Sequence, residues 1–177
     1  MALSTAEVQS TYAQYVIGNY MRAPIAIVRG EGSYVFDANG RRYLDLLPGL
    51  GVNGLGHCPK RVVDAIARQA RSLLHIHNNY MWEQQALLAK ALVDRLSGMP
   101  SARAFFCNSG TEASEAAIKL ARLYGKAKGG KWKLLSVENG FHGRTMGAQL
   151  AGGMEGQKRW MVDRDRTFVQ IPFPDGY

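Results

Sequence analysis

A strand-to-helix turn at residues 105–113 carries the residue types that bind a phosphate. Ser109 is followed three residues later by Glu112, which matches a capping box, where hydroxyl and carboxylate reciprocally bond backbone N–H groups at a helix start. Gly110 has no side chain, so an anion can approach the free amides and the positive end of the helix dipole. Similar turns also start helices that bind nothing, so this turn alone supports both interpretations.

A second loop, residues 139–145, offers an aromatic ring and a guanidinium after an apolar run at residues 134–137. Phe141 presents a flat face that can stack on an aromatic ligand. Arg144 presents a planar fork of donors that matches a carboxylate in bidentate fashion. Taken singly, Phe141 also fits core packing and Arg144 a surface ion pair. Their pairing with the first loop favours one shared ligand.

Several other kinds of site lack support. The sequence contains no GxGxxG for a dinucleotide and no GxxxxGK[ST] for a nucleoside triphosphate, which disfavours dehydrogenases, kinases and NTPases. His75 and His77 have no Cys or acidic partner at metal-site spacing, so no metal is expected. Cys107 fits a small buried apolar residue better than a nucleophile.

The charge of the chain does not indicate a nucleic-acid partner. Lys and Arg number 22 against 14 Asp and Glu, a net charge of +8, and such a surplus can attract nucleic acid or anionic membranes. The basic residues are spread along the chain, however, and the densest cluster, residues 158–166, contains Asp163 and Asp165. We therefore expect a solvated surface, with neither nucleic acid nor membrane as a partner.

The two loops are expected at one edge of a parallel sheet. Predicted strands at residues 104–107, 133–137 and 167–171 alternate with a helix at residues 111–126, which is typical of a parallel α/β fold. Ligands of such folds bind beyond the carboxyl ends of the strands. On the helix, Glu115 and Lys119 are expected to pair on the solvent side. The apolar positions expected to cover the sheet are Ala113, Ala116, Ala117, Leu120 and Tyr124.

The first part of the chain predicts a smaller lobe. Apolar spacing predicts an amphipathic helix at residues 5–20, and short β-rich runs at residues 25–28, 34–36 and 42–47 predict an antiparallel meander. A glycine-dense loop at residues 48–59 precedes two predicted helices, residues 59–74 and 82–96, and Pro59 opens the first. The expected division is residues 1–55 and residues 56–177.

Composition and termini predict a cytoplasmic globular protein. With 177 residues and 46% hydrophobic residues, the chain can form a real core. Residues 1–9 lack the basic start and apolar run of a signal peptide, and no run approaches the roughly 20 apolar residues of a membrane helix. Cys58 and Cys107 form no CxxC pair, which favours reduced thiols.

The ordered motifs resemble a known family. Residues 106–113, 115–122 and 141–145 are similar to class III aminotransferases and, within that class, to the acetylornithine aminotransferases. Residues 43–45 and 51–57 are similar as well, so the resemblance covers nearly the whole chain. It implies the α/β fold of aspartate aminotransferase-like transferases (fold type I) that use pyridoxal 5'-phosphate. Residues 1–55 would belong to the small domain, and residues 56–177 would form the first, incomplete part of the large cofactor-binding domain.

The resemblance implies a role for each candidate residue. Those at the cofactor would be Ser109, Gly110 and Thr111 on the phosphate, Phe141 stacked on the ring, and His142 beside it. Those at the substrate would be Arg144, gripping the α-carboxylate, and Asn53, lining the entrance.

The resemblance also implies what this chain lacks. The family's aspartate that keeps the pyridine nitrogen protonated, and the lysine that forms the Schiff base, both lie beyond Tyr177, so no catalytic residue is assigned and the chain alone is expected to be inactive. The implied reaction moves an amino group from acetylornithine, or a related terminal amine, to 2-oxoglutarate in a homodimer, and acetylornithine would place it in arginine biosynthesis. The alternatives are an ornithine or 4-aminobutyrate aminotransferase, or a noncatalytic product that binds the cofactor or pairs with a full-length subunit.

Overall fold

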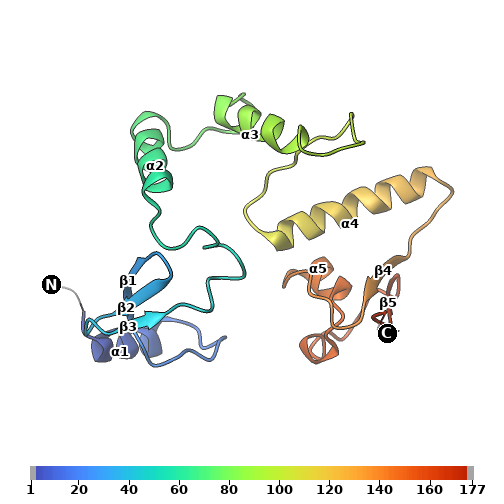
Figure 1. Ribbon diagram of the computed structural model, residues 1–177. Helices are drawn as coiled ribbons and strands as arrows, with labels where there is room; N and C mark the ends of the chain where they lie inside the picture. The colour runs from blue at the N-terminus through green and yellow to red at the C-terminus, as the bar shows by residue number, and fades with distance from the viewer. Residues whose placement is uncertain (1–2, 175–177) are drawn as a thin grey trace. The chain divides into compact units, whose positions relative to one another are not determined.

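A computed structural model describes residues 3–174, which form two compact units (Figure 1). Residues 1–80 make up the first unit and residues 81–177 the second. The sequence-based boundary at residue 55 refers to the lobes of a complete enzyme rather than to contacts within this chain, so that division stays a prediction. Among residues 3–174, no helix combines the length and the apolar character that crossing a membrane would require.

The first unit begins with helix α1, Thr5–Tyr15, which starts at a full capping box. Ser4 Oγ accepts the Glu7 amide at 3.3 Å, and the Glu7 carboxylate accepts the Ser4 amide at 2.8 Å. The predicted end at residue 20 is wrong: α1 stops at Tyr15, where Val16 is extended. Val16, Ile17 and Gly18 have low helix propensity, so nothing local sustains another turn.

The predicted antiparallel meander is confirmed. Strands β1, Ile27–Glu31, β2, Tyr34–Asp37, and β3, Arg42–Leu44, form one sheet in the order β1-β2-β3. Asp37 holds the turn between β2 and β3, because Oδ1 accepts the amides of Asn39 and Arg41, each at 2.9 Å, and Oδ2 accepts the Tyr43 hydroxyl at 2.8 Å.

The rest of this unit is the glycine-dense loop and helix α2, Lys60–Ser72. Positive φ angles at Gly49, Gly51 and Gly56 confirm the need for glycine in the loop. Pro59 was predicted at the first position of this helix, but it is the N-cap, and α2 begins one residue later.

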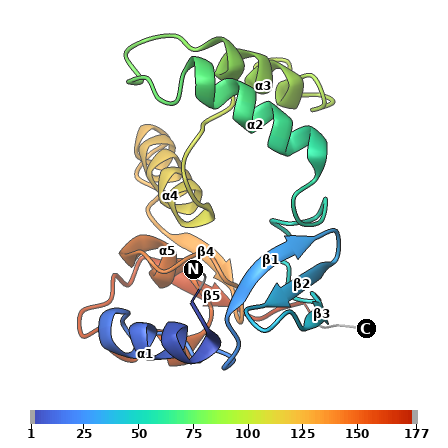
Figure 2. The same ribbon diagram turned by 90° about the vertical axis from the view of Figure 1, so that its left-hand side faces the viewer.

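The second unit begins with α3, Glu83–Val93, and the long helix α4, Gly110–Ala127. Strands β4, Leu134–Val137, and β5, Phe168–Ile171, pair in parallel, as predicted, with Leu134 opposite Phe168 and Val137 opposite Ile171. A short helix that the sequence did not indicate, α5, Met146–Ala151, packs against β4, β5 and α4 (Figure 2). A 3-10 turn, Glu155–Gln157, follows it.

The predicted strand at residues 104–107 is wrong. This segment has no hydrogen-bonded strand partner among residues 3–174, and Phe105 is exposed. A strand depends on pairing with another segment, which local β propensity cannot supply. In the described part of the chain, the start of α4 is therefore preceded by an unpaired connection, and the parallel sheet consists of β4 and β5.

Helix α4 contacts its unit through a polar stripe. Its less exposed residues include Thr111, Glu115, Ile118, Arg122 and Gly125, which recur every three or four residues and so share one side of the helix. Of the predicted apolar face, Ala116 is half-buried, but Leu120 is 64% and Tyr124 68% exposed. The prediction that these larger side chains cover the sheet is therefore wrong for the described residues.

Two contacts fix the far half of α4. Arg122 donates to Asp165 and to the Thr167 hydroxyl, each at 2.7 Å, which ties the helix to the segment entering β5. Gly125 is buried, and its carbonyl accepts the amide of Lys131 at 3.0 Å. A Cβ at Gly125 would overlap the carbonyl oxygen of Lys131.

Gly125→Ala should destabilise the second unit by about 1–3 kcal/mol, because backbone must move to admit one methyl group. Tryptophan fluorescence during urea unfolding measures this selectively, since Trp82, Trp132 and Trp160 all lie within residues 81–177. Gly156→Ala is the matched control, because a Cβ there meets nothing within 4 Å. Equal midpoints for the two variants would contradict the close approach at Gly125.

Asp165 should make the second unit sensitive to acid. Bonds from the Thr167 hydroxyl, then from Arg122 and the Thr167 amide, lower the pKa of Asp165 from 3.8 to about 2. A depressed pKa in the folded state stabilises the fold above the unfolded pKa, and this stabilisation is lost as pH falls from about 4 towards 2. In Asp165→Asn the urea midpoint should change less across this window than in the wild type. Asp163→Asn, an exposed control, should retain the wild-type slope, and a parallel loss in both variants would refute the assignment.

Candidate functional site

The first turn of α4 is organised by Ser109 and Glu112. Ser109 is the extended N-cap, and its hydroxyl accepts the Glu112 amide at 3.3 Å, as predicted. The reciprocal half of the predicted capping box is wrong, because the Glu112 carboxylate bonds the amide of Asn108, one residue before the N-cap. The side chains thus hold the helix start from both sides.

Open backbone donors remain at this helix start. Within residues 3–174, the amides of Gly110 and Thr111 have no hydrogen-bond acceptor, as expected for the first residues of a helix. A Cβ built on Gly110 meets nothing within 4 Å, so the space beside it is free. These donors, at the positive end of an 18-residue helix, suit an anion such as phosphate.

The second loop leaves β4 and turns sharply onto α4. Asn139 adopts φ 62°, and the Gly140 amide closes the turn on the Val137 carbonyl at 3.0 Å. Gly143 is buried with φ 133°, and a Cβ there would overlap the Thr111 hydroxyl and lie 2.9 Å from Thr111 Cα. The loop backbone can approach the first turn of α4 only because residue 143 is glycine.

Hydrogen bonds join the loop to the same turn. The hydroxyls of Thr111 and Thr145 are 2.9 Å apart, and the Thr145 amide donates to Thr111 Oγ1 at 3.4 Å. Thr145 Oγ1 donates to the Glu115 carboxylate, which also accepts the Ala148 amide at 2.9 Å. The bond from Thr145, followed by those from the backbone of α5, lowers the pKa of Glu115. The prediction that the two loops meet is confirmed.

The predicted partner of Glu115 is wrong. The sequence predicted a solvent-side ion pair with Lys119, but the Glu115 side chain points to Thr145 and the first turn of α5. No ion pair joins Glu115 and Lys119 among the described residues. The i,i+4 rule considers only side chains on the same helix. The partners that Glu115 bonds lie about thirty residues later in the chain.

The ring and guanidinium of the loop are accessible. Phe141 is 53% exposed and Arg144 is exposed, with no ion-pair or hydrogen-bond partner in the described part of the chain. His142 is also exposed, and its ring lies over Gly140, where Nε2 would be 3.6 Å from a Cβ. The cofactor and substrate roles of Phe141, His142 and Arg144 stay predictions, as do those of Ser109, Gly110 and Thr111 on the facing helix.

Asn53 lies in the first unit and is described within that unit only. It lines a cavity of about 210 Å³ together with Asp45 and His57. Asp45 Oδ2 and His57 Nε2 are 2.7 Å apart, and the bond to His57, followed by the Leu47 amide, lowers the pKa of Asp45. The Asn53 amide donates to Pro48 at 3.1 Å, so backbone bonds hold the residue in the glycine-dense loop. Its role at the substrate entrance stays a prediction.

Glu115, Gly143 and Thr145 form part of this arrangement, yet the sequence analysis gave them no role in holding the loops together. One signal points to them: Thr145 is the N-cap of α5 but makes no side-chain cap bond, and the first turn of α5 contains no acidic residue. The free amides of α5 therefore need an acceptor from elsewhere in the chain.

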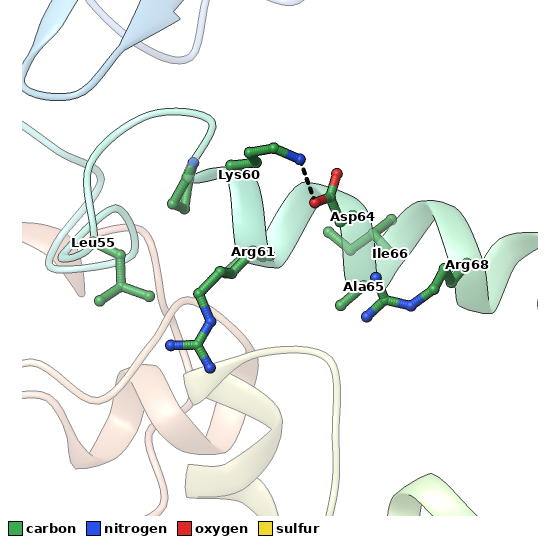
Figure 3. A pocket seen from close by; sticks show the side chains of 9 residues that line it. Leu55, Lys60, Arg61, Asp64, Ala65, Ile66 and Arg68 are labelled. Atoms are coloured by element: carbon green, nitrogen blue, oxygen red, sulfur yellow. Dashed lines mark hydrogen bonds and ion pairs between the residues drawn. The ribbon is translucent and has the colours of Figure 1, made fainter.

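A larger pocket in the first unit does not coincide with the predicted residues. It has a volume of about 880 Å³ and lies along the first half of α2, beside the Lys60–Asp64 ion pair of 2.7 Å (Figure 3). Its lining includes Leu55 and Ile66, both largely exposed, and none of the predicted cofactor or substrate residues. It is an open surface groove and does not define the candidate site.

Comparisons with known proteins identify the family. The profile of the family "Aminotransferase class-III" matches residues 15–177. Acetylornithine aminotransferase from Caldanaerobacter subterraneus subsp. tengcongensis is 46% identical over 164 residues, which cover 92% of this chain and 41% of that protein. The same enzyme from Aquifex aeolicus is 47% identical over 140 residues, which cover 78% of this chain and 37% of that protein.

Solved structures agree. Ornithine aminotransferase from Toxoplasma gondii ME49 matches 97% of this chain and 41% of its own, with a TM-score of 0.87 and 26% identity. Taurine:2-oxoglutarate aminotransferase from Bifidobacterium kashiwanohense, solved with PLP and glutamate, matches 100% of this chain and 41% of its own, with a TM-score of 0.87 and 32% identity.

The chain thus spans about 40% of the length of these relatives. Its α/β elements are those of the corresponding part of class III transaminases. On the family profile, the sequence identity and the shared fold, the chain belongs to the class III aminotransferases, a family that uses pyridoxal 5'-phosphate.

Proposed function

We propose that this chain is the phosphate-binding and ring-binding part of an aminotransferase that moves the amino group of acetylornithine, or of a related terminal amine, to 2-oxoglutarate. The single observation that supports it most is the contact between Thr111 on α4 and Gly143 and Thr145 on the second loop. This contact brings a set of open amides beside a segment that bears an accessible ring and a free guanidinium. The names of the curated relatives support acetylornithine as the donor.

The residues present fit pyridoxal 5'-phosphate. The phosphate suits the amides of Gly110 and Thr111 and the hydroxyl of Ser109, because Gly110 leaves open space in front of them. The exposed face of Phe141 suits the pyridine ring. When bound, pyridoxal phosphate supplies an electron sink for the carbon that loses a proton.

The other side chains orient the substrate. The guanidinium of Arg144 can hold a carboxylate through two parallel N–H bonds, which fixes both the position and the plane of that group. His142 would pack beside the cofactor, and Asn53 would line the entrance. In the complete protein the active site would form at a homodimer interface.

The chain on its own is proposed to be inactive. None of its lysines matches the motif of the family's cofactor-binding lysine. Lys158, for example, is only 4% exposed, and its Nζ donates to the Gly152 carbonyl at 2.7 Å and to Gln170 at 3.2 Å. That ammonium links α5 to β5 and is already engaged.

Two other functions have support. The fold match to an ornithine aminotransferase favours ornithine as a donor, and 4-aminobutyrate remains the other class III alternative. The open amides and the exposed ring also suit a noncatalytic chain that binds the cofactor or pairs with a longer subunit.

The complete product of the gene that encodes these residues should form glutamate from 2-oxoglutarate, with acetylornithine giving the highest kcat/KM among acetylornithine, ornithine and 4-aminobutyrate. The measurement is glutamate release at saturating pyridoxal phosphate. The 177-residue chain should release none, and borohydride should link the cofactor to no single mapped lysine in it. A higher kcat/KM with ornithine would reassign the donor, and cofactor binding without any transamination would favour the noncatalytic alternative.

Phe141→Leu should weaken binding of pyridoxine 5'-phosphate to the 177-residue chain by about 2- to 12-fold, since an aromatic stack contributes about 0.5–1.5 kcal/mol. Pyridoxine 5'-phosphate has the ring and phosphate but no aldehyde, so it cannot react with surface lysines. Calorimetric titration measures its affinity and that of inorganic phosphate, which should be unchanged. Tyr124→Leu, which removes an exposed ring from the outer side of α4, is the control. If both variants bind like the wild type, Phe141 does not contact the ring.

A further inference from the structure

We infer that Glu115 is a positioning residue, which sets the ring-binding and carboxylate-binding loop in register with the phosphate-binding turn. The inference rests on the proposed function and extends it to a residue that contacts neither cofactor nor substrate. It comes from the bonds that Glu115 makes outside its own helix.

Glu115 holds the end of the loop through its side chain. Its Oε1 accepts the hydroxyl of Thr145, the last residue of the loop, and the amide of Ala148, in the first turn of α5, at 2.9 Å. The backbone of Gly147, which lies next to the carboxylate, also helps to lower the pKa of Glu115. One carboxylate therefore takes the place of the side-chain cap that Thr145 does not provide for α5.

The proton arrangement links Glu115 to the phosphate-binding turn. Because the Thr145 hydroxyl donates to Glu115, it can accept the Thr111 hydroxyl at 2.9 Å. Thr111 Oγ1 in turn accepts the Thr145 amide at 3.4 Å. The hydrogen bonds from Glu115 to Thr145 and from Thr145 to Thr111 begin and end on α4. The end of the loop is therefore held to α4 at two positions.

Two glycines show how close the contact is. A Cβ at Gly147 would overlap Glu115 Oε2, just as a Cβ at Gly143 would overlap the Thr111 hydroxyl. Arg144 lies between Gly143 and Thr145, so both of its chain neighbours contact α4. The backbone from which the Arg144 side chain projects is thereby fixed, and Phe141 precedes the clamped segment by two residues.

The expected consequence is selective. Without the Glu115 carboxylate, the open amides of Gly110 and Thr111 remain and should still bind phosphate. The loop loses its anchor, so the ring of Phe141 should no longer be held at a fixed distance from the phosphate. Binding of a ligand that combines ring and phosphate should suffer, whereas binding of phosphate alone should not.

The test compares pyridoxine 5'-phosphate with inorganic phosphate in calorimetric titrations of the 177-residue chain. The wild type should bind pyridoxine 5'-phosphate about tenfold more tightly, the size of one aromatic stack. Both bonds of Glu115 end on Oε1, so the test variant must remove that oxygen. In Glu115→Leu, which has a similar volume and no acceptor, the tenfold preference should fall to about twofold while the phosphate affinity stays the same. Asp163→Asn removes one exposed carboxylate from the same unit and should keep the preference.

A second pair of variants tests the same link from the other side. Thr145→Val removes the hydroxyl between Glu115 and Thr111 at nearly constant volume and should lower the preference similarly, whereas Thr145→Ser retains the hydroxyl and should restore most of it. Preference retained in both Glu115→Leu and Thr145→Val would overturn the positioning role while leaving the proposed function intact. Equal loss of both ligands would also overturn it, because that result indicates a general scaffold. A wild type that shows no preference would instead overturn the proposed function.

Discussion

The close approach of the second loop to the first turn of α4 is the constraint on which the candidate site depends. It requires a residue without a side chain at position 143, because any Cβ would overlap the Thr111 hydroxyl. Without that approach, the open amides and the exposed ring would be two unrelated surface features. With it, a helix start with open amides and a loop with an exposed aromatic ring are in contact within one compact unit.

Hydrogen bonds rather than apolar packing set this arrangement. The contacting stripe of α4 uses Thr111, Glu115 and Arg122, each bonded to a defined partner beyond the helix. Apolar packing is non-directional and tolerates small shifts, whereas a hydrogen bond weakens steeply with distance and angle. A polar stripe therefore fixes the rotation and the axial position of α4 against the loop more strictly than leucines would. Ligand geometry depends on both of these quantities.

The sequence predicted those features that follow from a local signal or from a general rule of α/β sheets. The start of α4, the parallel pairing of β4 with β5 and the convergence of the two loops followed from a cap, periodicity and the rule for strand ends. The strand at residues 104–107 failed because pairing is a property of two segments. The predicted ion pair of Glu115 was wrong for the same reason, since its partners are Thr145 and the backbone of α5, about thirty residues later. The residue types of the site could be predicted from the sequence, but the bonds that aim them could not.

The two helix starts at this site differ in a way that bears on where an anion binds. Both α4 and α5 begin beside the loop, and each presents unpaired amides and the positive end of a dipole. At the α5 start, the Glu115 carboxylate accepts the Ala148 amide and the Thr145 hydroxyl. Glu112, the other acid in the first turns of α4, is held by the amide of Asn108. Both nearby carboxylates thus accept backbone amides. At the α4 start, the amides of Gly110 and Thr111 have no acceptor among residues 3–174, and the space beside Gly110 is open. A carboxylate thus already lies at the α5 start, so under the proposed function the phosphate of the cofactor would lie at the α4 start.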